Sequence, residues 1–152
     1  MSSNLKLRAW DKFNECFYFS EKASSFQAFF DNFQMLSGNG MVLEMYSTIN
    51  DSDGVEIYAG DIVEYELDNM EPESGTTKYR EEVKFIDGCF CVDGYTPLYA
   101  TTEWKLKRVG NIHEHPHLLC DRCKGTQLVS RTFHTENGDF DADNQPCPEC
   151  TQ

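Results

Sequence analysis

The sequence contains no uninterrupted apolar run of roughly 18 residues, which is the length that a membrane-spanning helix needs. Its first residues, Met1 to Asn4, lack the charged and then apolar pattern of a signal peptide. A glycine-rich phosphate loop, a nucleophile elbow and a plausible catalytic triad are also missing. We therefore expect a cytoplasmic protein without membrane association, and we expect it not to be an enzyme.

Basic residues are scarce. The 152 residues include 13 lysines and arginines against 26 acidic residues, a net charge of −13 that repels nucleic acid and anionic membranes at long range. Within residues 51–82, eleven acidic residues accompany only Lys78 and Arg80. This segment is either a solvated face with a flexible loop or a surface for a basic partner. In the second case, the residues predicted to bind the partner are Asp61, Glu64, Glu66, Asp68, Glu71 and Glu73.

Four cysteines near the C-terminus are the strongest motif present. Cys120 and Cys123 form one Cys-x-x-Cys pair, and Cys147 and Cys150 form a second. In a reducing compartment such pairs favour metal binding over disulfides. Four thiolates predict a structural zinc site, a closed tetrahedron without an open position for a reacting water. About 35 residues bury too little surface to fold alone, so the metal would stabilise the tail as a zinc ribbon.

The rest of the chain favours short strands separated by turns. Alternating or β-rich segments predict strands near 5–10, 16–19, 41–47, 57–65, 82–86, 89–92 and 104–109. Phenylalanines spaced as on one helix face predict a short helix that begins after Ser24 or Ser25: Phe26, Phe29, Phe30 and Phe33. Residues 68–77 predict a loop, and tight turns are predicted at Gly60-Asp61, Asp87-Gly88 and Asn137-Gly138. The fold class is mainly β: a small closed or strongly bent β-barrel with a short helical insertion, plus the C-terminal zinc ribbon.

Several segments, taken in order, resemble one known family. They are the residues 6–11 (KLRAWD), 46–48 (YST), 54–63 (GVEIYAGDIV), 83–90 (VKFIDGCF) and 109–119 (VGNIHEHPHLL). The chain resembles the YopX family, which bacteriophages and prophages encode. The resemblance implies a compact β-barrel-like fold and a phage origin. Together with the missing export signal, this makes the cytoplasm of the host bacterium the expected location. The resemblance implies no activity that can be assigned to particular residues.

The resemblance covers roughly residues 4–119 and leaves the cysteine-rich tail as an addition. His115-Pro116-His117 stands where the family usually has Asn-Pro-Glu. We therefore predict three parts: a YopX-like β-barrel domain at 1–112, a linker at 113–119 and the zinc ribbon at 120–152.

Other metal chemistry is weighed against this interpretation. His134-x-Glu136 followed by Pro146-Cys147-x-x-Cys150 matches the zinc-deaminase pattern, but the two halves are too close in sequence and Cys120 and Cys123 would be orphaned. His113 and His117 can share a face and bind metal, although a solvated linker is the commoner outcome. Three further cysteines are expected to be small core residues: Cys16, Cys89 and Cys91.

We expect a non-enzymatic phage accessory protein that binds a host component, foremost a host protein, and alters its activity, with counter-defence as the expected context. One alternative is a zinc-ribbon nucleic-acid-binding regulator, which the net charge disfavours. Another is a DNA mimic, or a sponge for a nucleotide immune signal. A sponge needs a deep pocket with aromatic walls, for which the candidates are Trp10, Tyr58, Tyr95 and Trp104.

Overall fold

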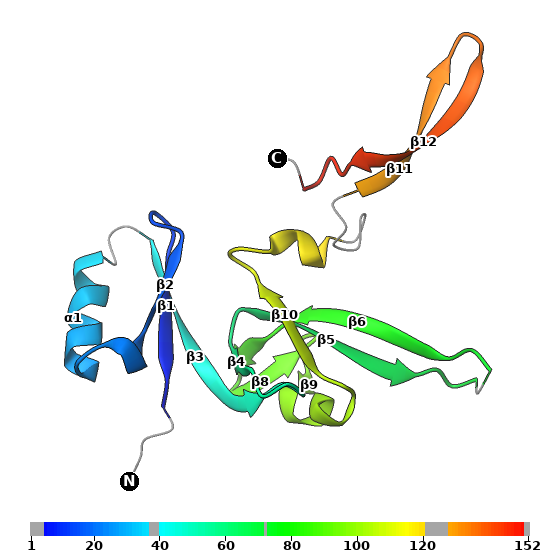
Figure 1. The fold of residues 1–152 in the computed structure, drawn as a ribbon. Coiled ribbons are helices and arrows are strands. Elements are labelled where there is room, and N and C mark those ends of the chain that lie inside the picture. The colour runs from blue at the N-terminus through cyan, green and yellow to red at the C-terminus, as the bar shows by residue number, and fades with distance from the viewer. Residues whose placement is uncertain (1–4, 37–39, 72, 121–127, 151–152) are drawn as a thin grey trace. The chain divides into compact units, whose positions relative to one another are not determined.

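The computed structural model describes residues 5–36, 40–71, 73–120 and 128–150. The chain divides into two compact units, Met1–Glu114 and His115–Gln152. Both units consist mainly of strands (Figure 1), so the prediction of a mainly β protein is confirmed. Among the described residues, no helix is long and apolar enough to cross a membrane.

The first unit carries ten strands and one α-helix within its described residues. In chain order the strands are β1 (Leu7–Asp11), β2 (Cys16–Phe19), β3 (Met41–Asn50), β4 (Glu56–Tyr58), β5 (Asp61–Asp68), β6 (Thr76–Glu82), β7 (Lys84–Ile86), β8 (Cys89–Val92), β9 (Thr96–Pro97) and β10 (Lys107–Asn111). The helices are η1 (Ser20–Lys22), α1 (Phe26–Leu36) and η3 (Leu98–Glu103), where η denotes a 3₁₀ helix.

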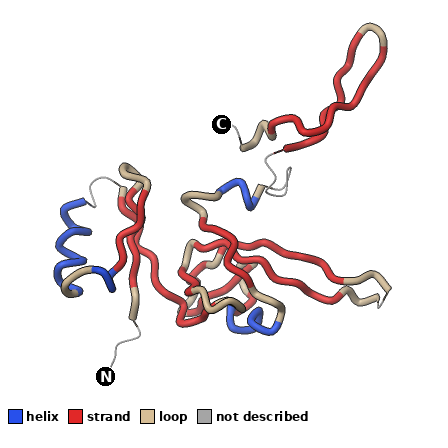
Figure 2. The backbone as a smooth tube through the Cα atoms, in the orientation of Figure 1, coloured by secondary structure: helices blue, strands red, loops and turns tan. Residues whose placement is uncertain are grey.

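The first sheet has the strand order β2-β1-β3-β4, and α1 packs on one of its faces (Figure 2). Successive side chains of β1 point to opposite faces. Leu7 and Ala9 therefore form a buried cluster with Phe29 of α1, whereas Arg8 and Trp10 point to the other face. The helix begins where the sequence predicts, because the Ser25 Oγ accepts a hydrogen bond of 3.1 Å from the Ala28 N–H.

The main core of this unit joins the remaining sheets, β10-β5-β6 and β7-β8-β9. It is lined by fully or nearly fully buried residues: Ile57, Val63, Tyr65, Val83, Val92, Leu98 and Leu106. β5 and β6 continue beyond this core as a long hairpin (Figure 1). The strong bending of these short sheets agrees with the predicted fold class.

Turn chemistry accounts for most of the predicted connections. Asp87 and Gly88 both take positive φ, 51° and 81°, as a two-residue turn between β7 and β8 requires. Gly60 also has positive φ, +87°, in the tight turn between β4 and β5. The prediction places a loop at 68–77, but the structure continues into β6 from Thr76, so that part of the expectation is wrong.

The described residues of the second unit form one hairpin preceded by a short 3₁₀ helix. η4 (Pro116–Leu119) leads to Cys120, and β11 (Leu128–Thr135) pairs with β12 (Gly138–Pro146). These strands are joined by a two-residue turn at Glu136-Asn137, one residue before the Asn137-Gly138 turn that the sequence predicts, because Thr135 pairs with Gly138. The predicted linker 113–119 spans the division between the units, because His113 and Glu114 belong to the first unit.

Candidate functional site

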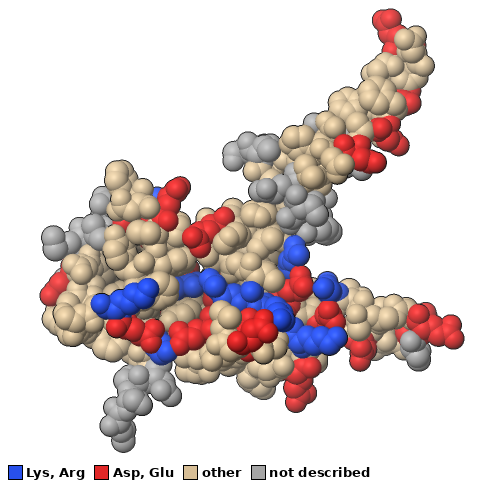
Figure 3. All heavy atoms as spheres, viewed as in Figure 1, with Lys and Arg blue, Asp and Glu red and all other residues tan. Residues whose placement is uncertain are grey.

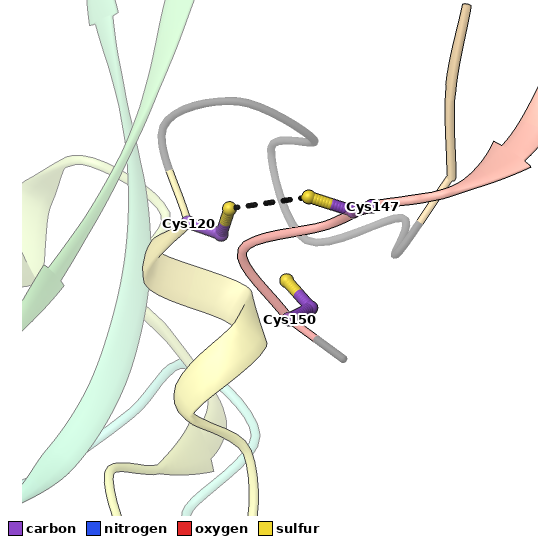
Figure 4. A group of neighbouring side chains, drawn as sticks. All are labelled: Cys120, Cys147 and Cys150. Atoms are coloured by element: carbon purple, nitrogen blue, oxygen red, sulfur yellow. Dashed lines mark hydrogen bonds between the residues drawn. The ribbon is translucent and has the colours of Figure 1, made fainter. Parts of the chain in front are cut away.

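Three cysteine side chains converge in the second unit. The sulfurs of Cys120, Cys147 and Cys150 all lie within 4.8 Å of one another (Figure 4). The Cys120 and Cys147 sulfurs are 3.8 Å apart, and Cys147 is fully buried. A disulfide would bring two sulfurs to about 2.05 Å. The three thiols therefore form a cluster that can hold a metal ion.

The spacing suits a tetrahedral thiolate site. Two sulfurs that each bind one zinc ion at about 2.3 Å, with a tetrahedral angle between them, lie about 3.8 Å apart. The separation between Cys120 Sγ and Cys147 Sγ has this value. Thiolate is also a preferred ligand type for zinc in structural sites. The donor type and this one separation thus allow zinc as the ion.

Local backbone structure brings these thiols together. The Cys120 N–H donates to the His117 carbonyl at 3.1 Å. This bond ends η4 at Cys120, whose side chain lies at the cluster. At the far end of β12, the Cys150 N–H donates to the Cys147 carbonyl at 3.2 Å. This turn is the local fold that lets two cysteines separated by two residues direct their sulfurs to one point.

The described residues contain three of the four predicted ligands and the histidine of the competing deaminase pattern. Cys123 falls outside the described residues, so its position relative to the cluster is a prediction. His134, the histidine of the deaminase pattern, lies on β11, and its Nδ1 is 2.8 Å from the Asp139 carboxylate. The group of ligand-type side chains found among the described residues contains the three cysteines and does not include His134.

In the first unit, one of the acids predicted to bind a basic partner, Asp61, is not exposed. Asp61 is fully buried and pairs with Arg8, with 2.7 Å between Nη2 and Oδ1, and with Arg108 at 3.1 Å. Its carboxylate is therefore not at the surface, where the prediction places it. Burying an unpaired carboxylate would be costly, which explains why two arginines accompany it.

Glu64 and Glu66 lie on the outward face of β5 and face basic partners. The register of β5 and β6 places Glu64 opposite Arg80 and Glu66 opposite Lys78. Arg80 Nε is 2.9 Å from the Glu64 carboxylate, and Lys105 Nζ is 3.1 Å from the Glu66 carboxylate. In Figure 3, basic and acidic side chains lie next to one another over part of the visible face. The acids of the hairpin that remain exposed are Asp68, Glu71 and Glu73.

The structure also contains a buried polar network that sequence reasoning missed. Arg8 contacts the Glu44 carboxylate at 2.7 Å as well as Asp61, and both acids are almost fully buried. The second oxygen of Glu44 lies 2.5 Å from the His113 Nε2, and the His113 ring stacks on Trp10. His113 is thus a packed residue of the first unit, which corrects its expected place in a solvated linker.

A usable sequence signal for this network exists. Arg8 stands between apolar residues in a strand that is predicted to be half buried, and Asp61 directly precedes Ile62 and Val63. Arg8, Asp61 and His113 also belong to three different segments of the family resemblance. Each carboxylate has a cationic or imidazole partner within the fold, which fits a structural role.

Other expectations on aromatic and cysteine residues are corrected. Trp10 contacts Phe17 and His113, Trp104 packs against Tyr65, and Tyr95 is 81% exposed. The four aromatic residues therefore do not form one pocket, because Trp10 and Tyr58 lie beside the Arg8 guanidinium and Phe17, whereas Trp104 packs in the core around Tyr65. Of the three cysteines expected in the core, Cys91 is buried but Cys89 is exposed. Burial raises the pKa of the Cys91 thiol.

The fold and the thiol cluster define a mainly β protein whose C-terminal hairpin can hold a metal. The chain matches the family described as YopX protein over residues 6–120, and it belongs to that family. Comparison with the curated proteins finds no match. The three clustered thiols lie at and beyond the end of the family match.

A solved structure is similar in fold. The crystal structure of protein EF1440 from Enterococcus faecalis has a TM-score of 0.53 and 21% sequence identity to this chain. The similarity covers 78% of this chain and 100% of that one. At this identity it shows the fold alone.

Proposed function

We propose that this protein is a non-enzymatic binding protein whose C-terminal hairpin is a zinc ribbon. In this proposal, Cys120, Cys123, Cys147 and Cys150 hold one structural Zn²⁺. The single observation that carries it is the 3.8 Å between the Cys120 and Cys147 sulfurs, which suits a tetrahedral zinc thiolate. Four thiolates fill the coordination sphere, so the ion stabilises the hairpin and activates no water.

The metal matters because the hairpin has little core of its own. Its aromatic pair, Phe133 and Phe140, stacks at 5.4 Å but stays 37% and 54% exposed. A two-stranded hairpin is marginally stable in water at best. A zinc ion bound at one end closes the hairpin and the preceding segment into one unit, which supplies the missing stability.

The test of this step is metal stoichiometry. Native mass spectrometry of protein purified without chelators is expected to show one zinc ion per chain. The Cys147→Ser variant should lose the ion, whereas Cys89→Ser, which changes an exposed cysteine outside the cluster, should retain it. A metal-free wild-type protein, or a disulfide within the cluster, would contradict the proposal.

The partner in this proposal is a protein of the host bacterium, and counter-defence is its context. The YopX resemblance to phage-encoded proteins supports the host setting, and the absence of a catalytic constellation in the sequence supports binding over catalysis. The exposed acids at the tip of the β5–β6 hairpin are candidate contacts for a basic partner: Asp68, Glu71 and Glu73.

An affinity capture from host lysate followed by mass spectrometry tests the partner. A triple variant with Asp68→Asn, Glu71→Gln and Glu73→Gln should reduce capture at low salt if these acids contribute. The matched control neutralises three acids of the second unit, Asp139→Asn, Asp141→Asn and Asp143→Asn. Equal loss in both variants would indicate a nonspecific charge effect and would remove the hairpin tip from the proposal.

The alternative functions have weaker support. Nucleic-acid binding needs basic side chains that meet phosphates. The described residues of the second unit carry five acids: Glu136, Asp139, Asp141, Asp143 and Glu149. A DNA mimic needs a row of unneutralised acids, but Glu64 has a basic partner on β6, and Glu66 has one in the turn before β10.

A further inference from the structure

The first unit has a pocket where α1 meets the edge of the first sheet. Its volume is about 200 Å³, and its walls come from β1, β2, η1, α1 and the start of β3. Phe29, Asn32 and Phe33 reach it from α1, and Tyr18 reaches it from β2. An apolar cavity of about 150 Å³ holds benzene. This pocket therefore has room for one aromatic or branched aliphatic side chain.

The strand beside the pocket has an open side. β2 is an edge strand of the sheet β2-β1-β3-β4, and in the described part of the chain no other strand pairs with its outer side. Alternate residues of an edge strand direct their N–H and C=O groups away from the sheet, where an added strand can bind them. Tyr18, in the middle of β2, remains 39% exposed.

The charge at the pocket has one sign. Among the described residues that line it, Lys22 is the one charged residue, and its Nζ lies 5.1 Å from the centre of the Phe19 ring. Lys22 is exposed and stands directly after β2, in η1. An extended chain that follows β2 would therefore meet a cation near one end of the strand.

We infer that this edge binds an extended peptide segment of a partner protein, which adds a strand to β2 and inserts one bulky apolar side chain into the pocket. An acidic group close to that side chain would pair with Lys22. This is recognition by strand addition, in which backbone hydrogen bonds give affinity and a side-chain pocket gives specificity. The inference rests on the proposed function in one respect, that the partner is a protein.

The experiment selects peptides from a random twelve-residue display library against the full-length protein. Binding of the selected peptides is measured by fluorescence anisotropy, and amide chemical shifts map their contacts. We expect the enriched peptides to share a bulky apolar residue near an acidic one and to shift the amides of residues 16–19. Methylating the backbone nitrogens that face β2 should weaken binding by about tenfold or more, because it removes the added strand's donors.

Two surface variants test the charge. Lys22→Glu should weaken binding by about tenfold, whereas Lys84→Glu, the same change at an exposed lysine of β7, should leave it within about twofold. Ala23→Leu, which fills the pocket from its rim, should abolish binding. Thermal unfolding of each variant verifies its fold. If Ala23→Leu does not fold, Lys22→Glu still tests the binding site, because Lys22 is exposed.

Several outcomes overturn the inference. A selection without enrichment, or selected peptides whose contacts map away from residues 16–19, would contradict it. Binding that is insensitive to backbone methylation would exclude strand addition. Phenylacetate that binds as tightly as the peptides would make this a small-molecule pocket. Dimerisation through β2 would make a second copy the occupant. Cys147→Ser separates this inference from the zinc proposal, because it should lose metal and keep peptide binding.

Discussion

Arg8 and Asp61 are 53 residues apart in the sequence and form a buried ion pair, with 2.7 Å between Nη2 and Oδ1. Arg8 also contacts Glu44 on β3, so one guanidinium joins three strands of the first unit. The Arg8 and Asp61 side chains are 2% and 0% exposed. Water therefore cannot readily solvate one charge when the other is removed.

Removing Arg8 should therefore destabilise the first unit strongly. Arg8→Met leaves two buried carboxylates without their shared cation, and the expected loss in the free energy of unfolding is about 3–5 kcal/mol. Denaturation in guanidinium chloride measures it. The control is Arg80→Met, which breaks the more exposed pair with Glu64 and should cost about 0–1 kcal/mol. Equal losses in the two variants would contradict a special role for the buried network.

Gly60 is expected to tolerate substitution poorly, because it lies against Glu44, an acid of the Arg8 network. A Cβ at this position would clash with a carboxylate oxygen of Glu44, and the backbone has a φ of +87°. Gly54 has nearly the same φ, +82°, but a Cβ added to it would meet no atom within 4 Å.

Gly54→Ala should cost about 1–2 kcal/mol from backbone strain alone. Gly60→Ala should cost clearly more, because it also displaces Glu44 from its partners. Chemical denaturation of both variants isolates the packing contribution as their difference. Similar losses would show that the close approach to Glu44 relaxes without cost.

Asp51 should make the stability depend on acidity. Its burial acts to raise its pKa, but hydrogen bonds from the N–H groups of Arg108, Val55 and Asp53 outweigh burial and lower the pKa below its usual value. The folded state thus favours the ionised form. This contribution is fully present above the unfolded pKa of about 4 and is lost as the pH falls through the lower folded pKa.

Asp51→Asn should therefore reduce the free energy of unfolding by about 1–3 kcal/mol at neutral pH. The difference from wild type should shrink as the pH falls through the lowered pKa of Asp51, where the wild-type carboxyl also becomes protonated. Asp53→Asn is the control, since Asp53 forms an exposed pair with Lys107 at 2.6 Å. Unfolding measured at several pH values would contradict this if the Asp51→Asn difference stayed constant.

Removing the metal should unfold the second unit selectively. A chelator is expected to collapse the amide signals of residues 128–150 into the unfolded range, while the signals of the first unit stay dispersed, because the two units form separate compact bodies. Zinc readdition should restore the signals. A hairpin that keeps its amide dispersion without metal would show that its strands are stable alone.

Local patterns predicted the short-range structure well. The Asp87-Gly88 turn, the start of α1 after Ser25 and the strands beside them follow from residues that are neighbours in sequence. The Asn137-Gly138 signal falls within one residue of the observed turn at Glu136-Asn137. β6 was missed because its outward residues are charged, and its pattern makes sense only opposite Glu64 and Glu66. Cross-strand pairing of this kind is not visible in a single segment.

The candidate site residues also differ in how far local sequence predicts their positions. The convergence of Cys120, Cys147 and Cys150 was predictable from spacing, because each Cys-x-x-Cys pair is a local motif. The burial of Asp61 was not predicted, although Ile62 and Val63 follow it directly, because its partners Arg8 and Arg108 come from distant strands. An acidic residue in a charged segment looks solvated until its partners are placed.

The stacking of Trp10 on His113 gives the molecule a built-in optical reporter. Their ring centres are 5.0 Å apart and nearly parallel, whereas Trp104, the other tryptophan, packs against Tyr65 in a different core. Emission from the two indoles can be separated by replacing either with phenylalanine. Opening at the Arg8 network can then be followed in time, independently of events around Tyr65.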